Sequence, residues 1–91
     1  MKLEPGMLAI SKAGHDKDRI YVIIRTEDKY VYVADGELRP LRHMKRKNAG
    51  HLQPVLKMRL EGEPDDEAVR SLISRYTRQG GKGLGTGAGG L

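Results

Sequence analysis

The stretch His43–Leu52, which reads HMKRKNAGHL, holds the side chains best suited to chemistry. Lys45, Arg46 and Lys47 stand side by side, Asn48 follows them, and a histidine lies at each edge. Like charges packed together contribute nothing to folding, but Lys and Arg can replace the counterions condensed along a phosphate backbone. Asn and His can add hydrogen bonds to phosphates, 2′-hydroxyl groups or base edges. The stretch therefore predicts contact with a polyanion.

The basic residues are concentrated in the middle of the chain. The 91 residues include 17 Lys plus Arg and 12 Asp plus Glu, for a net charge of +5. No acidic residue occurs from Leu38 to Leu60, whereas five carboxylates follow between Glu61 and Glu67. The seven cations of the acid-free block are Arg39, Arg42, Lys45, Arg46, Lys47, Lys57 and Arg59. This separation of charge favours a polyanionic partner over a solvated surface that serves only solubility.

Enzyme and metal sites are not predicted, because the residues that they require lack the necessary spacing. The chain has no Cys, which excludes a thiolate metal site and a Cys nucleophile and fits the reducing cytoplasm. Asp16 and Asp18 resemble the first two ligands of a calcium loop, but Ile20 stands in the place of the third. The three histidines share no ligand spacing, and no serine lies in a nucleophile elbow. A G-x-G-x-x-G match in residues 85–90 lacks the strand and helix that a dinucleotide site needs.

We therefore expect a non-catalytic binding protein without a metal, a cofactor or a small-molecule substrate. No apolar run approaches the roughly 20 residues of a membrane-spanning helix. The first residues, MKLEPGMLAI, lack the long apolar segment of a signal peptide. The expected location is the cytoplasm, with no membrane partner.

Short β-strands must position the basic residues. The segments Met7–Ser11, Ile20–Thr26 and Tyr30–Ala34 are rich in β-branched and aromatic residues or alternate with period two. Turn residues separate them, including Asp35-Gly36. Weaker extended segments follow around ELRPLR and HLQPVLKM, where the prolines suit edge strands or bends. Several short strands indicate a small barrel or sandwich. A barrel from about Leu3 to Val55 is predicted, because its closure removes exposed sheet edges.

The alternation also predicts which strand residues face the core. The expected inward residues are Leu8, Ile10, Val22, Ile24, Val31 and Val33. The three adjacent cations are expected on an exposed polar connection after the third strand, where none of them can be buried. Tyr30 and Tyr32 lie on one side of their strand. They could form a stacking platform for bases, cover the outer face of the barrel or pack under a helix.

A helix is predicted from about Asp65 to Arg78. Val69, Leu72, Ile73 and Tyr76 recur at the spacing of one apolar helical stripe. Acidic residues in the first turn and arginines in the last agree with the helix dipole. The stripe is expected to dock on the barrel, with a partner protein as the alternative. The predicted organisation is a barrel in residues 1–60, an acidic linker and helix in 61–79, and a flexible Gly-rich tail in 80–91.

Residues Gly6 to Gly36 resemble the KOW motif, a strand–loop–strand unit of several ribosomal proteins and transcription elongation factors. The matching elements are Gly6, the loop SKAGHDKDR and the hairpin IYVIIRTEDKYVYVADG. The longer match, to KRKNAGHL, is similar to the small KOW-domain RNA-binding proteins of Gram-positive bacteria. These resemble in turn a class of archaeal and eukaryotic large-subunit ribosomal proteins. The resemblance, over about Leu3 to Leu52, implies an SH3-like barrel that binds RNA.

Two residues depart from the family pattern. Asp18 occupies the place of a loop glycine, so it must tolerate a positive φ if the family geometry holds. Met44 stands where the family commonly has Pro before the basic triplet.

Together, the resemblance and the charge pattern predict a non-catalytic protein that binds RNA, ribosomal RNA or the ribosome. The expected RNA-binding residues are Lys12, His15, Lys17, Arg19, Arg39, Arg42, His43, Lys45, Arg46, Lys47, Asn48 and His51. The alternative is a protein-interaction module that docks on RNA polymerase or a translation factor through its strands and helix.

Overall fold

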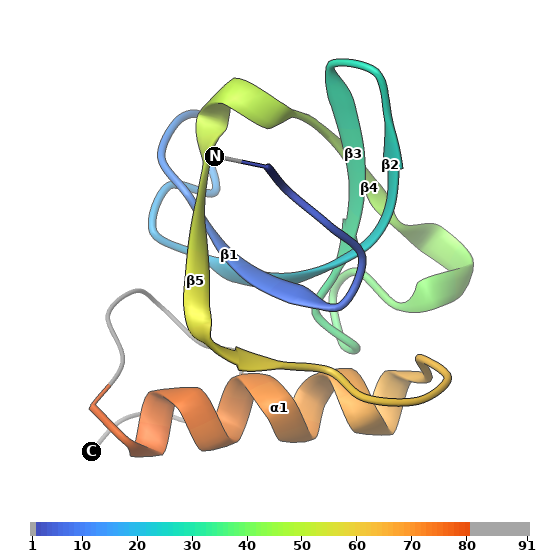
Figure 1. Cartoon of the computed structure of the whole chain (residues 1–91), viewed down its shortest axis with the longest axis vertical. Coiled ribbons are helices and arrows are strands. Elements are labelled where there is room, and N and C mark those ends of the chain that lie inside the picture. Colours follow the sequence, from blue (N-terminus) through green and yellow to red (C-terminus); the bar gives the residue numbers. More distant parts are fainter. Residues whose placement is uncertain (1, 81–91) are drawn as a thin grey trace.

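The computed structural model describes residues 2–80. The predicted mobile tail, apart from Gly80, lies outside the described residues. The elements, in chain order, are β1 (Met7–Ser11), β2 (Ile20–Glu27), β3 (Tyr30–Ala34), the 3₁₀ turn η1 (Leu41–His43), β4 (Lys45–Asn48), the 3₁₀ turn η2 (Ala49–His51), β5 (Leu52–Arg59) and α1 (Asp66–Arg78). The strands form one curled sheet, and α1 lies along one side of it (Figure 1). The predicted mainly β fold with one C-terminal helix is confirmed.

The sheet is antiparallel throughout, with the strand order β4-β3-β2-β1-β5. The three strands predicted from period-two patterns lie where the sequence places them. The segment around ELRPLR was expected to be extended, but it forms a turn followed by η1. The expected closure of the barrel is also only partial, because β4 and β5 remain the two edges of the hydrogen-bonded sheet. The turn η2 carries the chain from one edge strand directly to the other.

The sheet has an apolar core on both of its faces. The interior cluster consists of Met7, Ala9, Tyr21, Ile23, Val31, Val33 and Leu52. The cluster on the outer face joins Leu8, Ile10, Ile20, Val22 and Val55 to the helix stripe Val69, Leu72, Ile73 and Tyr76. Val22 and Val31 are both buried, as predicted, but the expected inward set divides between the two faces. Because both faces are covered, burial does not report which way a strand residue points.

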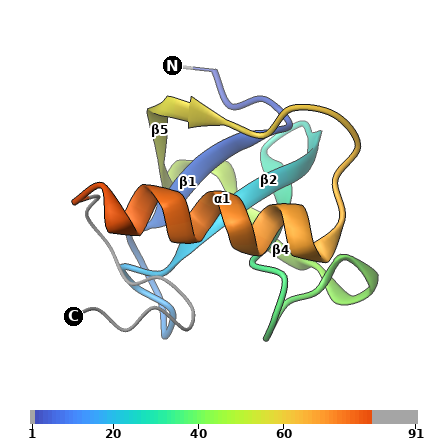
Figure 2. The same ribbon diagram turned by 90° about the horizontal axis from the view of Figure 1, so that it is seen from below.

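The helix covers the part of the outer face that β1, β2 and β5 form. Seen from below, α1 crosses β1 and β2 (Figure 2). Its stripe residues are at most 7% exposed, and each fully buried aliphatic side chain contributes about 1.5–3 kcal/mol. The Asp65 side chain accepts a hydrogen bond from the Ala68 backbone N–H at 2.7 Å and caps the first turn. The prediction that the stripe docks on the chain's own sheet is confirmed.

A β-bulge in β2 changes the facing of the residues that follow it. The pairing of β2 with β3 shifts between Ile23 and Arg25, which leaves an extra residue, Ile24, in β2. Thr26 is therefore paired with the interior residue Val31, while Arg25 is paired with Tyr32 on the outer face. In residues 2–80 no helix is long and apolar enough to cross a membrane.

Candidate nucleic-acid interface

The basic triplet lies on β4 and not on an exposed connection, so one sequence prediction is wrong. Strand geometry sends alternate side chains to opposite faces of the sheet. Lys45 and Lys47 are paired with the interior residues Val33 and Val31, whereas Arg46 is paired with Tyr32 on the outer face. Lys47 is only 8% exposed. The three cations therefore cannot act as one cluster.

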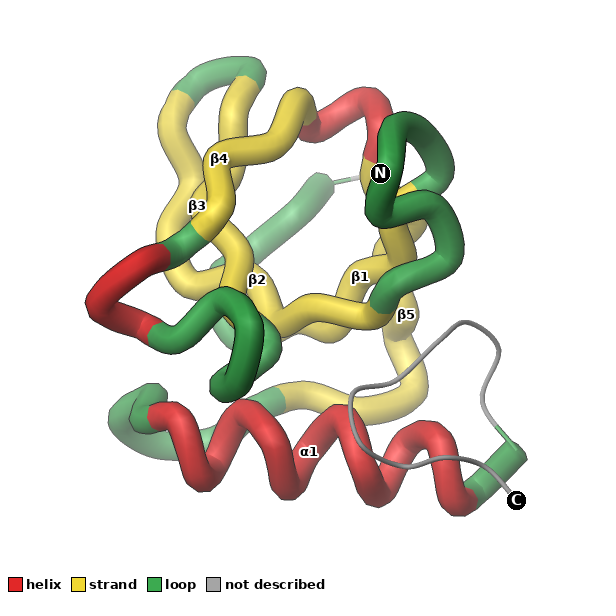
Figure 3. Tube along the Cα trace, turned by 180° about the vertical axis from the view of Figure 1, so that it is seen from behind, coloured by secondary structure: helices red, strands yellow, loops and turns green. Residues whose placement is uncertain are grey.

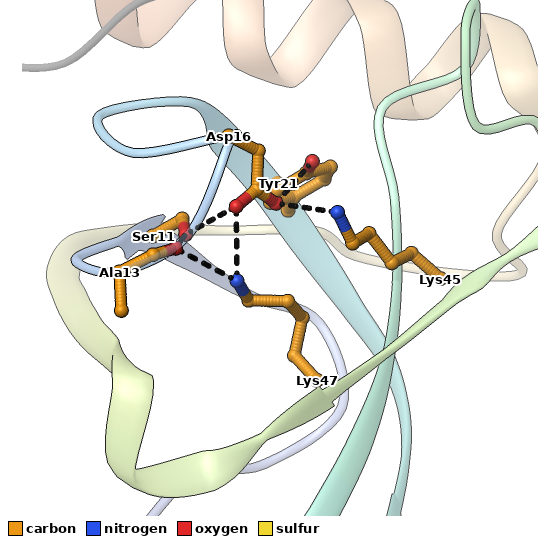
Figure 4. A network of polar contacts seen from close by, with 6 residues as sticks. All are labelled: Ser11, Ala13, Asp16, Tyr21, Lys45 and Lys47. Carbon is orange, nitrogen blue, oxygen red and sulfur yellow. Dashed lines mark hydrogen bonds and ion pairs between the residues drawn. The ribbon is translucent and has the colours of Figure 1, made fainter.

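The buried Lys47 belongs to a network around the carboxylate of Asp16 (Figure 4). Its Nζ donates to Asp16 Oδ1 at 3.0 Å and to the carbonyl oxygen of Ala13 at 3.2 Å. Ser11 Oγ donates to Asp16 Oδ1 at 3.0 Å, and Tyr21 Oη donates to Oδ2 at 2.8 Å. Lys45 Nζ lies 3.1 Å from Oδ2. The network ties β4 to the connection between β1 and β2.

The surroundings of Asp16 keep it ionised. Burial alone raises the pKa of its carboxyl group, but hydrogen bonds from Lys47, Tyr21, Lys45 and Ser11 outweigh that effect and hold the pKa well below its usual range. Burial and the hydrogen bond to Asp16 raise the pKa of Tyr21 above its ordinary value. One carboxylate against two ammonium groups leaves the network with one net positive charge.

The connection between β1 and β2, residues 12–19, is a tight loop held by its own backbone. The Asp18 N–H donates to the carbonyl of Ser11 at 2.7 Å, and the Arg19 N–H donates to that of Asp16 at 2.9 Å. Asp18 has a φ of 74°, so this position has the positive φ that the sequence resemblance implied. The loop holds His15 and Lys17 at the surface.

The turn from Asp35 to Arg39 is held from within and from the helix. Asp35 Oδ1 accepts hydrogen bonds from the N–H groups of Glu37 and Arg39, both at 2.8 Å. Arg70 Nη1 of α1 donates to the Gly36 carbonyl at 2.8 Å. Gly36 itself packs so closely on α1 that a Cβ there would lie 2.5 Å from the carbonyl oxygen of Asp66. The turn is therefore fixed on the folded core.

The two loops and β4 lie on one side of the molecule, the near side in Figure 3. Between them is a groove of about 370 Å³, and a second of about 610 Å³ adjoins it through Leu38 and Arg39. The first groove is lined by His15, Asp16, Lys17, Arg19, Tyr21, Asp35, Leu38, Arg39 and Lys45. The second adds Glu37, Pro40, Arg42 and His43. We call this pair the basic groove.

The charge balance of the basic groove favours an anion. Its first part contains four cationic side chains, from Lys17, Arg19, Arg39 and Lys45. Its two carboxylates are already engaged, since Asp16 pairs with Lys45 and Lys47 and Asp35 accepts two turn N–H groups. Lys17, Arg19 and Arg39 are therefore the cations of this part that a ligand can reach most directly. Cations on a fixed frame around a concave surface strengthen the local positive potential.

The structure thus divides the predicted site. Seven of the expected residues line the basic groove, namely His15, Lys17, Arg19, Arg39, Arg42, His43 and Lys45. Lys47 is buried, and Arg46 faces the other side of β4. Asn48 caps η2 by accepting from the Gly50 N–H at 2.8 Å. Lys12 and His51 are joined by a backbone hydrogen bond of 2.8 Å and line neither part of the groove.

Sequence reasoning missed the residues that build the groove. Asp16 and Asp35 were not expected there, although an Asp followed by Gly is a recognised turn signal. The exposed Leu38, with 70% of its surface accessible, also lies in the groove without having been anticipated. The distribution of cations along the chain does not identify these residues, because the two carboxylates act by positioning their neighbours and the leucine carries no charge.

The other large cavity in the described part of the chain has few charged side chains. A cavity of about 590 Å³ at the other end of the barrel has one Lys and one Asp in its lining. That lining consists of Lys2, Leu3, Thr26, Asp28, Val31, Ala49, Gly50, Leu52 and Pro54. Within residues 2–80 no group of three or more His, Asp or Glu side chains could hold a metal ion.

Neither a protein-family model nor a curated protein matches this chain. The resemblance to KOW domains therefore stays a prediction from the sequence.

Proposed function

We propose that the protein is a non-catalytic RNA-binding protein that holds the phosphate backbone in the basic groove. The observation that carries this proposal is the convergence of Lys17, Arg19, Arg39 and Lys45 from two loops and one strand. The two carboxylates of its first part, Asp16 and Asp35, are engaged by internal partners. Such an arrangement can replace condensed counterions along a nucleic acid. The sequence resemblance favours RNA over DNA and makes ribosomal RNA the expected target.

The alternative, a module that docks on a protein through its strands and helix, has lost its main support. That alternative requires an apolar helix stripe without a partner in the monomer. The stripe is instead buried on the sheet of the same chain. The basic groove is the better candidate.

Salt dependence of RNA binding tests the proposal. The triple variant K17Q/R19Q/R39Q removes three groove cations and leaves the Asp16 network intact. Each neutralised contact with single-stranded RNA changes the slope of log affinity against log salt by about 0.7, so the triple variant should flatten the slope by about 2. Fluorescence anisotropy with labelled oligoribonucleotides at several salt concentrations measures that slope.

The control variant removes the same charge elsewhere. K57Q/R75Q/R78Q changes three exposed cations of β5 and α1 that do not line the groove. Arg70 is unsuitable as a control, because its guanidinium holds the Gly36 turn. Equal losses in both triple variants would show an effect of net charge alone, and absence of binding by the unaltered protein would refute the function. Crosslinking in cells followed by sequencing identifies the RNA.

A further inference from the structure

The part of the outer sheet face that α1 leaves uncovered has an ordered set of aromatic and cationic side chains. Across three strands, Arg25 of β2, Tyr32 of β3 and Arg46 of β4 are direct neighbours in register. In the next row, Tyr30 is flanked by Glu27 and Asn48. We call Arg25, Tyr30, Tyr32 and Arg46 the Tyr–Arg patch.

Each tyrosine of the patch already has a guanidinium over its ring. Arg25 Cζ lies 4.2 Å from the centroid of the Tyr32 ring, and Arg46 Cζ lies 4.6 Å from that of Tyr30. Glu27 holds the first pair, because its carboxylate accepts from Tyr32 Oη at 3.3 Å and lies 3.7 Å from Arg25 Nη2. Planar groups that are already ordered lose less side-chain freedom when a ligand binds.

The patch is accessible as well as ordered. Tyr30 is 37% exposed, and the Arg25 side chain is 55% exposed. Its residues carry two positive charges against the single carboxylate of Glu27, so the face suits a weakly anionic, flat partner. Aromatic rings and guanidinium planes are the surfaces on which proteins stack unpaired bases.

The position of the patch relative to the basic groove identifies the kind of ligand. Lys45 lines the groove and its neighbour Arg46 is on the patch, since consecutive residues of β4 point to opposite sides. A strand of RNA that crosses β4 can therefore reach both surfaces. A regular duplex cannot use the patch in this way, because its bases are stacked on one another within the helix.

We propose that the Tyr–Arg patch stacks unpaired bases of a single-stranded or looped RNA whose backbone lies in the basic groove. This inference rests on the proposed function and adds the class of RNA. It assigns base contacts to Tyr30 and Tyr32 and phosphate contacts to the groove. It also gives Arg46 a role that is separate from that of the two lysines beside it.

The test compares a labelled oligouridylate with an RNA duplex of the same length. Stacking on an aromatic side chain is worth roughly 1–3 kcal/mol per base, which corresponds to about a 5- to 150-fold change in affinity at about 1.4 kcal/mol per tenfold. Y30A/Y32A should bind oligouridylate at least about 5-fold more weakly than the unaltered protein. Its affinity for the duplex and the salt dependence of its binding should not change. Y30F/Y32F should retain binding, since the rings remain. L56A, which removes an exposed apolar side chain from β5, is the matched control.

Nuclear magnetic resonance of the unaltered protein gives a readout that does not depend on the variants' folding. The ring protons of Tyr30 and Tyr32 should move upfield when oligouridylate is added and stay in place with the duplex. The buried ring of Tyr76, which lies outside the basic groove, serves as the internal control. Ring shifts absent with both probes, or equal losses on both for Y30A/Y32A, would overturn the stacking role. If only the groove triple variant weakens binding, the proposed function stands and this inference fails.

Discussion

Substitution of Lys47 by Met should destabilise the fold far more than the same change at Arg46, its neighbour in sequence. K47M keeps the length of the side chain but removes the ammonium group that contacts Asp16 Oδ1 at 3.0 Å and the Ala13 carbonyl at 3.2 Å. Both charged partners are buried, at 8% and 9% exposure. The loss should therefore reflect a carboxylate in a poorly solvated site that keeps only the half-buried Lys45 as a cationic partner, and not a screened surface pair.

The magnitude follows from what remains around Asp16. Removing one partner of a buried ion pair costs about 3–5 kcal/mol. Lys45 still lies 3.1 Å from Oδ2, and Ser11 and Tyr21 still donate, so we expect the lower limit of about 3 kcal/mol for K47M. R46M removes one cation–π contact from an exposed site and should cost about 1 kcal/mol or less.

Urea denaturation followed by circular dichroism measures both losses. For a domain of this size, about 3 kcal/mol corresponds to a fall in Tm of roughly 12–24 °C, at about 4–8 °C per kcal/mol. D16N/K47M also removes the buried carboxylate and should be more stable than K47M, because the cation that then lacks a partner, Lys45, is 29% exposed and can be solvated. A K47M loss no greater than that of R46M would refute the reasoning that the network stabilises the fold.

Two further predictions concern the loops that build the groove. Because the pKa of Asp16 is depressed in the fold, its stabilising effect is complete above the unfolded-state pKa of about 3.9 and is lost as pH falls below that value. The free energy of unfolding, measured by urea titration at each pH, should therefore fall more steeply for the unaltered protein than for D16N. Parallel curves for the two proteins would contradict the assignment. G36A should be more destabilising than G62A in the same assay, because both glycines have a φ of 82° but only the Gly36 Cβ would meet the Asp66 carbonyl at 2.5 Å and Arg70 Cγ at 2.6 Å. The shared positive φ costs an alanine about 1–2 kcal/mol, so G62A should lose about that much and G36A clearly more; equal losses would show that the turn can move away from α1.

Local patterns were sufficient to predict most of the elements. The strand Met7–Ser11 follows a turn signal, and Tyr30–Ala34 alternates with period two, so both could be located without tertiary information. The helix was predicted from its apolar stripe, its acidic first turn and the arginines of its last turn. In each case, the signal and the element occupy the same few residues.

The facing of the strands could not be predicted, because it depends on distant segments. Leu8 and Val31 are equally plausible inward residues until it is known that α1 covers the outer face of β1. The bulge at Ile24 then reverses the face of the sheet to which the later side chains of β2 point. No residue type in that segment predicts the bulge.

The basic triplet shows the same limit for the candidate site. Three adjacent cations suggest one surface, but a four-residue strand divides them between two. The burial of Lys47 depends on Asp16, which is 31 positions away in the chain. The only indication in the sequence was that consecutive side chains of an extended segment point to opposite faces. That rule does not identify Asp16 as the partner of Lys47.

The strand order also sets how this chain reaches its native state. β1 pairs with its neighbour β2 and with β5, which is reached only after β2, β3 and β4. The hairpin of β2 and β3 can form from local contacts, whereas the β1–β5 ladder requires closure of a long loop before its contacts contribute. During synthesis, β1 therefore keeps one edge unpaired until β5 has left the ribosome, and α1 can dock fully only after β5 has placed Val55 beside β1. The rate-limiting step of folding should accordingly be the pairing of β1 with β5. Mutations in the β1–β5 ladder should therefore slow folding more than mutations at the tip of the β2–β3 hairpin.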